Sequence, residues 1–355
     1  MAHVSFRSVS KHFGNVRAVD DVSFDIDDGE FVCLLGPSGC GKTTTLRLMA
    51  GLEQVTHGTI HIAGKDMTTA KPKERDIGMV FQDYALFPHM TILDNIGYPL
   101  KVRGVPAEKR RERVTEVARS LSMDHLLDRR PAQISGGQQQ RTSVARAVVH
   151  KPQVFLFDEP LSNLDAKLRL EARSFLKHLQ RELGVTSLYV THDQAEAMAL
   201  ADKVAVMDAG KIVQLDHPLS VYHKPTNTFV ANFLGSPPMN LLQVSFDGDL
   251  FKGEGFSLPT GPFEKRLQDV AHGDRLTLGV RPEHLRLGNG TWSLGGQAYA
   301  IEPLGPESLV SIRVADYLVT ARIFGDELPA VEGHTELAFE PAHVHLFGTD
   351  GLRLD

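Results

Sequence analysis

The stretch Phe31-Val32-Cys33-Leu34-Leu35-Gly36-Pro37-Ser38-Gly39-Cys40-Gly41-Lys42-Thr43-Thr44 joins a continuous apolar run to a glycine-rich turn. An uninterrupted apolar run of this kind is typical of a strand buried on both faces of a parallel sheet. The turn matches the pattern GxxxxGK[ST], in which glycines let backbone N–H groups curl around phosphate oxygens without a Cβ in the way. The sequence therefore predicts a P-loop, and with it a nucleoside triphosphate site.

The residue types in this turn explain how it would hold a triphosphate. A helix that begins near Gly41 presents unpaired N–H groups and the positive end of its dipole to the anion. Lys42 places a compact positive charge against the β- and γ-phosphates, and the Thr43 hydroxyl is suited to ligate Mg²⁺. The complete motif argues against the plain alternative of a flexible turn with a solvated lysine. The predicted phosphate contacts are Gly36, Pro37, Ser38, Gly39, Cys40, Gly41, Lys42, Thr43 and Thr44.

The bulk composition is that of a globular protein with a substantial core. The chain has 355 residues, of which 42% are hydrophobic and 23% charged, and its length suggests two domains. A net charge of -6 argues against nucleic acid as a partner. No apolar stretch approaches a membrane span, the first residues lack the pattern of a secretory signal, and the two cysteines, Cys33 and Cys40, imply no disulfide framework. A cytosolic address is expected.

The order of apolar patterns predicts how the chain is organised. Short apolar runs alternate with helical patterns over residues 1–235, which predicts an α/β domain with a largely parallel sheet. Residues from about 88 to 150 contain no convincing strand and are expected to form a helical insertion. Glycine and proline near residue 235 indicate a linker. Residues 236–355 alternate short β-rich runs with glycine turns, which predicts a small all-β barrel or sandwich.

Two acids end the apolar run Val154-Phe155-Leu156-Phe157, in the Walker B arrangement. Asp158 is expected to hold Mg²⁺, and Glu159 to polarise and orient an attacking water as a general base. A kinase would need this space for an acceptor substrate, so the second acid favours hydrolysis. His192 follows another apolar run, Ser187–Val190, where it could hydrogen-bond the γ-phosphate; a structural or solvated histidine is the alternative reading.

A second glycine-rich segment, Ile134-Ser135-Gly136-Gly137-Gln138-Gln139-Gln140-Arg141, lies 23 residues before Asp158 (158 minus 135). A serine and two glycines open a predicted helix, so a hydroxyl and bare N–H groups form a further anion site. Read more simply, the segment is an N-cap with flexible glycines. Because the P-loop already occupies one face of a nucleotide, this second anion site can bind a nucleotide that is held by another copy of the chain.

These motifs together resemble those of the ATP-binding-cassette (ABC) ATPases, over about residues 4–235. The family signature LSGGQ stands here as Ile134-Ser135-Gly136-Gly137-Gln138, and Ser162-Asn163-Leu164-Asp165 resembles the D-loop. Phe13 sits where the family stacks an aromatic ring on adenine, Gln82 where it has the Q-loop glutamine that senses Mg²⁺ and water, and His192 where it has the switch histidine. The resemblance implies a P-loop NTPase (RecA-like) core that binds ATP and Mg²⁺.

The same resemblance implies a head-to-tail homodimer with two ATP molecules between the P-loop of one copy and the signature of the other. Ser135, Gly136, Gly137 and Gln138 would then act in trans, with Arg129 and Gln133 close by. Lys42, Gln82, Glu159 and His192 would form the catalytic set, and Thr43, Gln82 and Asp158 the metal set. ATP binding would close the dimer, and hydrolysis would release it.

The region after residue 235 resembles the carbohydrate-importer ATPases of the maltose and glycerol-phosphate type. Phe233–Asn240 and Gly279–His284 carry this likeness, which implies an OB-like C-terminal domain with dimerising or regulatory roles. It also implies transmembrane permease partners, a functional link to an external solute-binding protein, and a peripheral place on the cytoplasmic side of the cell membrane. The segment Gln82–Thr91, with Tyr84, Leu86, Phe87 and Met90 expected to be exposed, would receive a permease helix; the alternative is that these residues merely pack the helical insertion.

Three other functions remain open on the sequence. Related C-terminal domains occur in importers of polyamines, iron, sulfate and molybdate, so another solute is the main alternative. A soluble ABC protein that acts on DNA or the ribosome would need a coiled coil, a second cassette or a basic groove, and none is visible. A P-loop kinase would leave Glu159 and the signature unexplained.

Overall fold

The chain divides into two compact units, residues 1–219 and 220–355. The computed structural model describes residues 3–268, 270–325 and 333–354. The division lies 16 residues before the domain boundary predicted at 235 (235 minus 219), because helix α8 (Thr228–Phe233) packs on strands of the second unit. Within the described ranges, no helix is long and apolar enough to cross a membrane.

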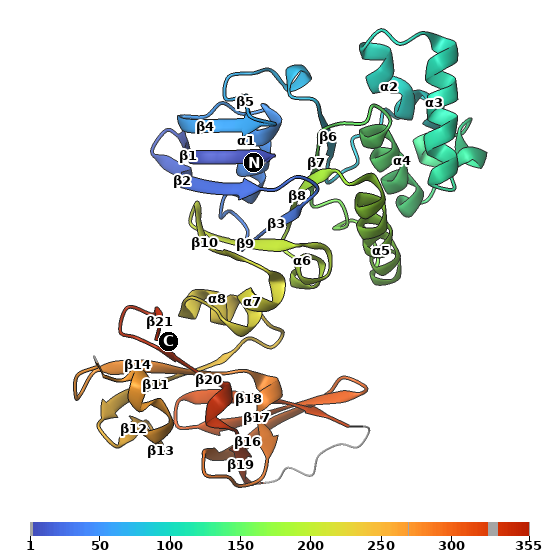
Figure 1. Cartoon of the computed structure of the whole chain (residues 1–355). Coiled ribbons are helices and arrows are strands. Elements are labelled where there is room, and N and C mark those ends of the chain that lie inside the picture. Colours follow the sequence, from blue (N-terminus) through green and yellow to red (C-terminus); the bar gives the residue numbers. More distant parts are fainter. Residues whose placement is uncertain (1–2, 269, 326–332, 355) are drawn as a thin grey trace. The chain divides into compact units, whose positions relative to one another are not determined.

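A six-stranded sheet forms the centre of the first unit, in the order β10-β9-β3-β8-β7-β6 (Figure 1). All neighbouring pairs are parallel except β10 with β9. The strands are β10 (Lys211–Asp216), β9 (Lys203–Asp208), β3 (Phe31–Leu35), β8 (Thr186–Thr191), β7 (Val154–Asp158) and β6 (Ile77–Val80). Every residue of β3 and β8 is buried, as the continuous apolar runs predict. The parallel strands bring the loops after β3, β7 and β8 to one edge of the sheet.

A second, antiparallel sheet completes the α/β core, in the order β2-β1-β4-β5. Its strands are β2 (Val16–Ile26), β1 (Val4–Phe13), β4 (His57–Ile62) and β5 (Lys65–Asp66). Helix α1 (Lys42–Ala50) packs its buried residues into one hydrophobic core with both sheets. Phe6 and Phe24 stack at a ring distance of 4.6 Å within this core. The P-loop helix is thus held on two sides by apolar packing.

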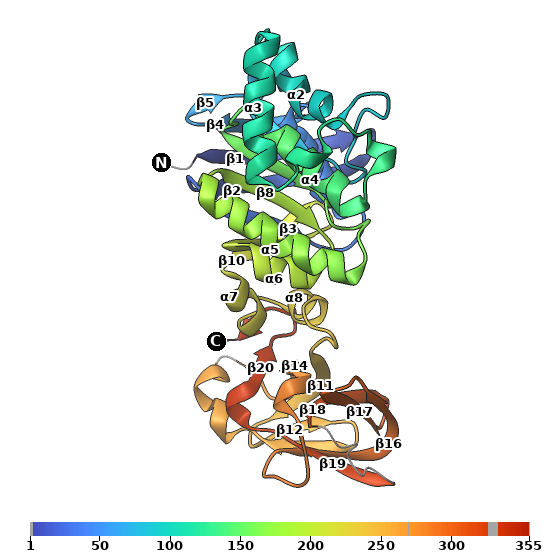
Figure 2. The ribbon, with the colours of Figure 1, turned by 90° about the vertical axis from the view of Figure 1, so that its right-hand side faces the viewer.

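Helices cover the remaining face and form the insertion that the sequence predicts. Helix α5 (Ala166–Leu183) packs beside Phe155 and Phe157 of β7, and α6 (Gln194–Leu200) lies against β3 and β8. Between β6 and β7 the chain forms α2 (Ile92–Val102), α3 (Ala107–Ser120) and α4 (Gly136–Val148), with no strand among them. These three helices gather in one cluster, seen in green and teal in Figures 1 and 2.

The second unit is a two-sheet β structure preceded by α7 (Pro218–His223), which spans the division between the units, and α8. One sheet has the order β13-β12-β11-β14-β20-β21 and the other β15-β19-β16-β17-β18. Their strands are β11 (Asn240–Asp247), β12 (Leu250–Gly253), β13 (Phe256–Pro259), β14 (Arg275–Val280), β15 (Arg286–Leu287), β16 (Ser293–Pro303), β17 (Glu307–Val314), β18 (Tyr317–Phe324), β19 (His334–Ala338), β20 (Val344–Phe347) and β21 (Arg353–Leu354). Buried side chains from both sheets form one core together with Trp292, which lies just before β16 and is the largest buried side chain. All strand pairs among the described residues of the second unit are antiparallel, in agreement with the predicted all-β barrel or sandwich.

Candidate functional site

The P-loop wraps around the ammonium group of Lys42. Its Nζ donates hydrogen bonds to the carbonyl oxygens of Gly36 at 2.7 Å and Pro37 at 2.9 Å, and the residue is only 5% exposed. Gly41 has φ +105°, and a Cβ there would lie 2.3 Å from the carbonyl oxygen of Ala18. Only glycine fits this position without moving backbone. The structure thus places a buried cation and the uncapped N-terminus of α1 at the same spot.

Asp158 and Thr43 form the next part of the site, at the end of β7 and the start of α1. The Thr43 hydroxyl donates a hydrogen bond of 3.3 Å to Oδ1 of Asp158. Burial raises the pKa of the Asp158 carboxyl, the Thr43 hydrogen bond opposes this rise, and the charge of Glu159 adds to it. A hydroxyl beside a carboxylate is the hard-oxygen ligand set that Mg²⁺ prefers, so these two residues fit the predicted metal. Gln82, the third residue of the predicted metal set, is exposed.

Glu159 and His192 lie together at the same edge of the sheet. Nδ1 of His192 is 2.9 Å from Oε2 of Glu159. The Glu159 backbone is left-handed, with φ 44°, and its N–H donates to the carbonyl of Val190 on β8 at 3.0 Å. Left-handed backbone in a residue with a Cβ is costly and collects at functional sites. The strand-end acids and the histidine that the sequence singled out are therefore one cluster.

A buried group under this cluster was not found by sequence reasoning. Glu196 on α6 is 3% exposed and accepts hydrogen bonds from Tyr189 at 2.7 Å and Thr191 at 2.8 Å. Burial raises the pKa of Glu196. These bonds fix the end of β8 immediately before His192. The spacing Asp193-x-x-Glu196 is a helix-start signature that could have drawn attention to this carboxylate, since Asp193 caps the helix.

The Q-loop and D-loop segments also meet. Nδ2 of Asn163 donates a 2.8 Å hydrogen bond to the carbonyl of Gln82. Arg169, just beyond, donates to the Leu164 carbonyl at 3.1 Å and pairs with Asp193 at 3.3 Å. The D-loop is therefore bonded directly to the segment that carries Gln82, and Arg169 links its Leu164 to Asp193, the residue after His192.

The signature residues form the N-terminus of α4 and are solvent-accessible. Ser135 Oγ accepts from the N–H of Gln138 at 3.4 Å, and Gln138 Oε1 accepts from the N–H of Ser135 at 3.0 Å, which is a reciprocal capping box. Gly136 and Gly137 open the helix, so its first two residues carry no side chain. Among the described residues no hydrogen bond or ion pair joins this segment to the P-loop of the same chain. Nearby, Arg129 donates to the Gln133 carbonyl at 3.5 Å.

Phe13 ends β1 and is 47% exposed, with Nζ of Lys11 at 4.7 Å from its ring centre. An exposed flat ring at the edge of the core is free to stack on a base. This exposed position agrees with the predicted stacking on adenine, which stays a prediction.

A groove of about 490 Å³ lies between the core and the helical insertion. Its lining includes Phe81, Ala85, Phe87, Val102 and Arg146. The prediction that Tyr84 is exposed here is wrong: Tyr84 is 6% exposed, and its backbone is left-handed, with φ 61°. Leu86 and Met90 are half-buried and do not line the groove.

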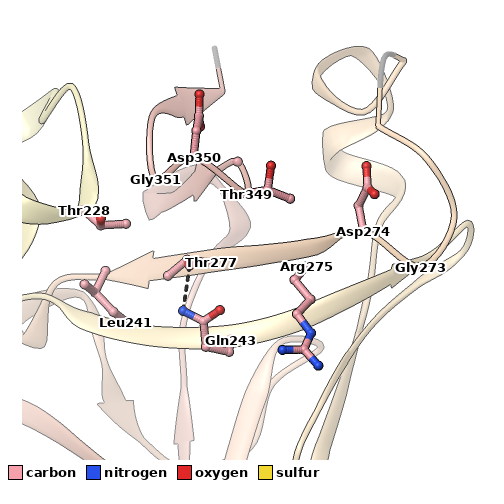
Figure 3. Close-up of a pocket in the computed structure, with 11 residues that line it drawn as sticks. Thr228, Leu241, Gln243, Gly273, Asp274, Arg275, Thr277, Thr349, Asp350 and Gly351 are labelled. Carbon is pink, nitrogen blue, oxygen red and sulfur yellow. Dashed lines mark hydrogen bonds between the residues drawn. The ribbon is translucent and has the colours of Figure 1, made fainter.

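The second unit has a polar cavity of about 750 Å³, shown in Figure 3. Thr228 of α8, Gln243 of β11 and Thr277 of β14 line it together with the loop 348–351. Gln243 Nε2 donates a 2.9 Å hydrogen bond to Thr277 Oγ1, so part of its hydrogen-bonding capacity is satisfied internally. Sequence analysis named none of these residues.

Comparison with known proteins assigns the chain to a family. Residues 19–162 match the family described as ABC transporter, residues 235–285 the MalK OB fold domain and residues 278–347 the TOBE domain. The sulfoquinovosyl glycerol transport ATP-binding protein of Agrobacterium fabrum is 46% identical over 98% of both chains. The chain belongs to the ABC transporter family. Its first unit is an ABC-type ATPase domain for ATP, which confirms the resemblance stated on the motifs.

Further ABC relatives match this chain over most of their own length. The xylose/arabinose import ATP-binding protein of Haloferax volcanii is 45% identical over 98% of this chain and 94% of its own. The sn-glycerol-3-phosphate import ATP-binding protein of Bordetella bronchiseptica is 48% identical over 94% of this chain and 93% of its own. A dimeric ATP-binding cassette in a post-hydrolysis state with ADP and phosphate matches with a TM-score of 0.55 and 32% identity, over 61% of this chain and 98% of that one. The P-loop NTPase core with a C-terminal OB-type region is thereby confirmed.

Proposed function

We propose that this ABC ATPase couples ATP binding and hydrolysis to the import of a sugar or sugar-like solute through a partner membrane permease. One observation carries the proposal: Lys42, Asp158 and Glu159 meet at one sheet edge in a chain that matches import ATP-binding proteins over nearly its whole length. The relatives' printed names concern sugars, a sugar-derived glycerol and a glycerol phosphate. They favour hydroxylated solutes over polyamines, iron, sulfate or molybdate.

The phosphate side of the reaction rests on α1 and β7. Lys42 and the N–H groups at the start of α1 bind the β- and γ-phosphates of ATP. Thr43 and Asp158, with Gln82, would hold Mg²⁺ through oxygen atoms. When bound, the metal ion neutralises charge on the phosphate oxygens as the terminal bond breaks. The Phe13 ring stacks on the adenine.

Glu159 supplies the water chemistry in this proposal. Its carboxylate accepts a hydrogen bond from the attacking water and orients it toward the γ-phosphorus. His192, whose Nδ1 is 2.9 Å from Oε2 of Glu159, would hold the carboxylate in place and hydrogen-bond the γ-phosphate. ATP and water become ADP and phosphate, and the loss of the γ-phosphate breaks the contacts of Lys42 and His192 at once.

The second half of each site comes from another copy of the chain. Ser135, Gly136, Gly137 and Gln138 would cap the γ-phosphate held by the partner's P-loop, with Arg129 and Gln133 near it. The two glycines that open α4 support this role, because backbone without side chains can approach an anion closely. A homodimer closed by two ATP molecules follows, and the dimeric cassette among the structural relatives supports it.

The groove between the core and the helical insertion would receive a permease segment. Its lining mixes Phe81, Ala85 and Phe87 with an exposed valine, Val102, which is 67% exposed. Apolar grooves of this size accept an amphipathic helix in many complexes. The subunit would then sit peripherally on the cytoplasmic side of the membrane, and an external solute-binding protein would deliver the solute to the permease.

The test is solute uptake in the source organism after deletion of this gene and its return as variants. Wild-type chain should restore uptake of at least one labelled solute among xylose, arabinose, glycerol 3-phosphate and sulfoquinovosyl glycerol. Glu159→Gln should bind ATP but restore no uptake, because the base is lost. Val102→Asp should keep the ATPase activity of the isolated chain yet lose uptake. Restoration by Glu159→Gln would refute the base assignment, and uptake of sulfate or a polyamine alone would refute the solute class.

A further inference from the structure

The backbone between the Q-loop glutamine and the helical insertion is held in an unfavourable shape. Tyr84 and Ala85 are both left-handed, with φ 61° and 47°. A Cβ disfavours this region for every residue except glycine, so two consecutive non-glycine residues there need outside support. The sequence Gln82-Asp83-Tyr84-Ala85 contains no glycine that would relieve it.

The support comes from one arginine on α4. Arg146 donates from one guanidinium nitrogen to the Ala85 carbonyl at 2.7 Å and from the other to the Tyr84 carbonyl at 2.7 Å. Ser143 on the same helix also donates to the Tyr84 carbonyl, at 3.0 Å. Arg146 is 9% exposed, and its guanidinium lies 6.0 Å from the Phe87 ring centre. The buried guanidinium donates charge-assisted hydrogen bonds to these two carbonyl groups. Such bonds are stronger than those that a neutral side chain could donate.

The contacts of Arg146 join helix α4, which carries the signature residues, to the segment from Gln82 to Phe87, which borders the groove. Helix α4 begins at the signature residues Ser135–Gln138 and carries Arg146 in its last turn. The segment that Arg146 holds starts at Gln82, whose carbonyl is bonded to Asn163, and ends at Phe87, whose N–H and carbonyl are bonded to Asn95 of α2. Ala85, Phe87 and Arg146 all line the groove.

We propose that Arg146 is a positioning residue that makes helix α4 and the segment 82–87 move as one body. A segment that fills the groove presses on Ala85 and Phe87, and the guanidinium passes that displacement to α4 and to Gln82 together. The inference rests on the proposed function, in which the groove binds the permease and the α4 N-terminus completes the partner's ATP site. It adds the physical link between those two surfaces.

The experiment compares Arg146→Lys with wild type in the full-length chain. Lysine keeps the charge but cannot bridge two carbonyls with a planar fork. Amide hydrogen exchange of residues 83–87 should rise by about tenfold or more as the left-handed turn opens. The kcat for ATP should fall about tenfold, because Gln82 and the signature lose their common support, while the KM for ATP changes less than about twofold. The KM for Mg²⁺ should rise as Gln82 shifts.

Two further variants separate positioning from simple stability. Arg113→Lys is the matched control: Arg113 lies in the same helical insertion and donates to the Val149 carbonyl at 3.3 Å, but no contact joins it to segment 82–87 among the described residues. It should leave kcat, KM and exchange of that segment unchanged. Ala85→Gly removes the Cβ that makes the left-handed turn costly, so the double variant Ala85→Gly/Arg146→Lys should regain part of the lost kcat.

Unchanged exchange in segment 82–87 of Arg146→Lys would overturn the proposal. A fall in kcat that appears equally in Arg113→Lys, or that Ala85→Gly fails to repair, would also overturn it by reducing Arg146 to general stability. Hydrogen exchange measures how firmly Arg146 holds segment 82–87 in the full-length chain, and it needs no permease. If Val102→Asp still supports uptake while Arg146→Lys shows every expected change, the groove assignment fails and the link between α4 and Gln82 stands.

Discussion

Two helices of the first unit begin with glycine-rich turns, but the two N-termini are built in opposite ways. Helix α1 starts after left-handed Gly41 with no side-chain cap, and Lys42 beside it is buried. Helix α4 starts after Ser135 in the extended conformation, and Ser135 and Gln138 satisfy each other's N–H groups. The first is packed between two sheets, whereas the second faces solvent.

In the proposed function, the α1 N-terminus holds ATP with groups of its own chain, whereas the α4 N-terminus acts only on a nucleotide held by a second chain. The start of α1 has the cation of Lys42, the proposed metal-binding oxygens of Thr43 and Asp158, and the proposed general base Glu159 at the same sheet edge. The start of α4 has only a hydroxyl and N–H groups, and its capping box must give way before it can bind an anion. We therefore expect the α1 N-terminus to bind ATP by itself, and the α4 N-terminus to act only when an ATP-loaded copy presents a phosphate to it.

The largest expected effect comes from disabling one N-terminus at a time. Lys42→Ala should abolish ATP binding, whereas Ser135→Arg should leave ATP binding to the monomer intact and block closure of the dimer. Each change alone should lower hydrolysis by at least about 100-fold, since each removes a group that stabilises phosphate charge. Nucleotide binding by fluorescence titration and phosphate release would measure the two effects separately.

Mixing the two variants sharpens the comparison. A heterodimer has one composite site in which an intact P-loop faces an intact α4 N-terminus, so the mixture should regain hydrolysis that neither variant shows. Two copies of Lys42→Ala at the same total concentration serve as the control. A mixture as inactive as its components would mean that Ser135 does not act across the interface.

A matched pair of glycine substitutions gives a smaller, more diagnostic effect. Gly41→Ala forces a Cβ to within 2.3 Å of the Ala18 carbonyl oxygen at φ +105° and should cost about 1–3 kcal/mol of unfolding free energy. Gly136→Ala meets nothing closer than Leu164 Cδ2 at 3.6 Å, and alanine is the better helix former. It should therefore keep or raise the melting temperature while lowering kcat about tenfold, because its methyl group obstructs approach to the partner's phosphate. Unchanged kcat in Gly136→Ala would exclude close approach of this turn.

The sequence could predict the cluster at the sheet edge because each of its residues is marked by the stretch of sequence immediately before it. Each of Lys42, Asp158 and His192 follows a continuous apolar run, and parallel strands carry such residues to one edge whatever their separation along the chain. The burial of Tyr84 could not be predicted, since it depends on a left-handed turn that Arg146 stabilises from 62 residues away in sequence. Glu196 was missed for the same reason: its partners, Tyr189 and Thr191, face it only once β8 and α6 are packed.

The smallest expected effect concerns the folding free energy that the chain loses because the Asp158 carboxylate is buried beside α1. Because burial raises the pKa of Asp158, its neutral form is favoured in the folded chain. This contribution to stability is fully present below pH 3.8 and is lost as pH rises through the raised pKa, so the ionised carboxylate opposes folding at neutral pH in the absence of metal and nucleotide. Asp158→Asn should then raise the melting temperature at pH 8 by about 2 °C, a value reduced by partial solvent exposure.

The pH dependence decides whether the Asp158 carboxylate is the cause. The gain of Asp158→Asn should shrink as pH falls toward 4, where the wild-type carboxyl takes up its proton, and Mg²⁺ with ATP should reverse it at pH 8 by stabilising only the wild type. Asp165→Asn is the control, because this exposed residue caps α5 by accepting from the Leu168 N–H at 2.9 Å and asparagine caps equally well. A gain in melting temperature that is constant from pH 8 to pH 4 would mean that Asp158→Asn acts through packing and not through charge. The site at the start of α1 would then have no electrostatic cost, and in this respect it would not differ from the N-terminus of α4.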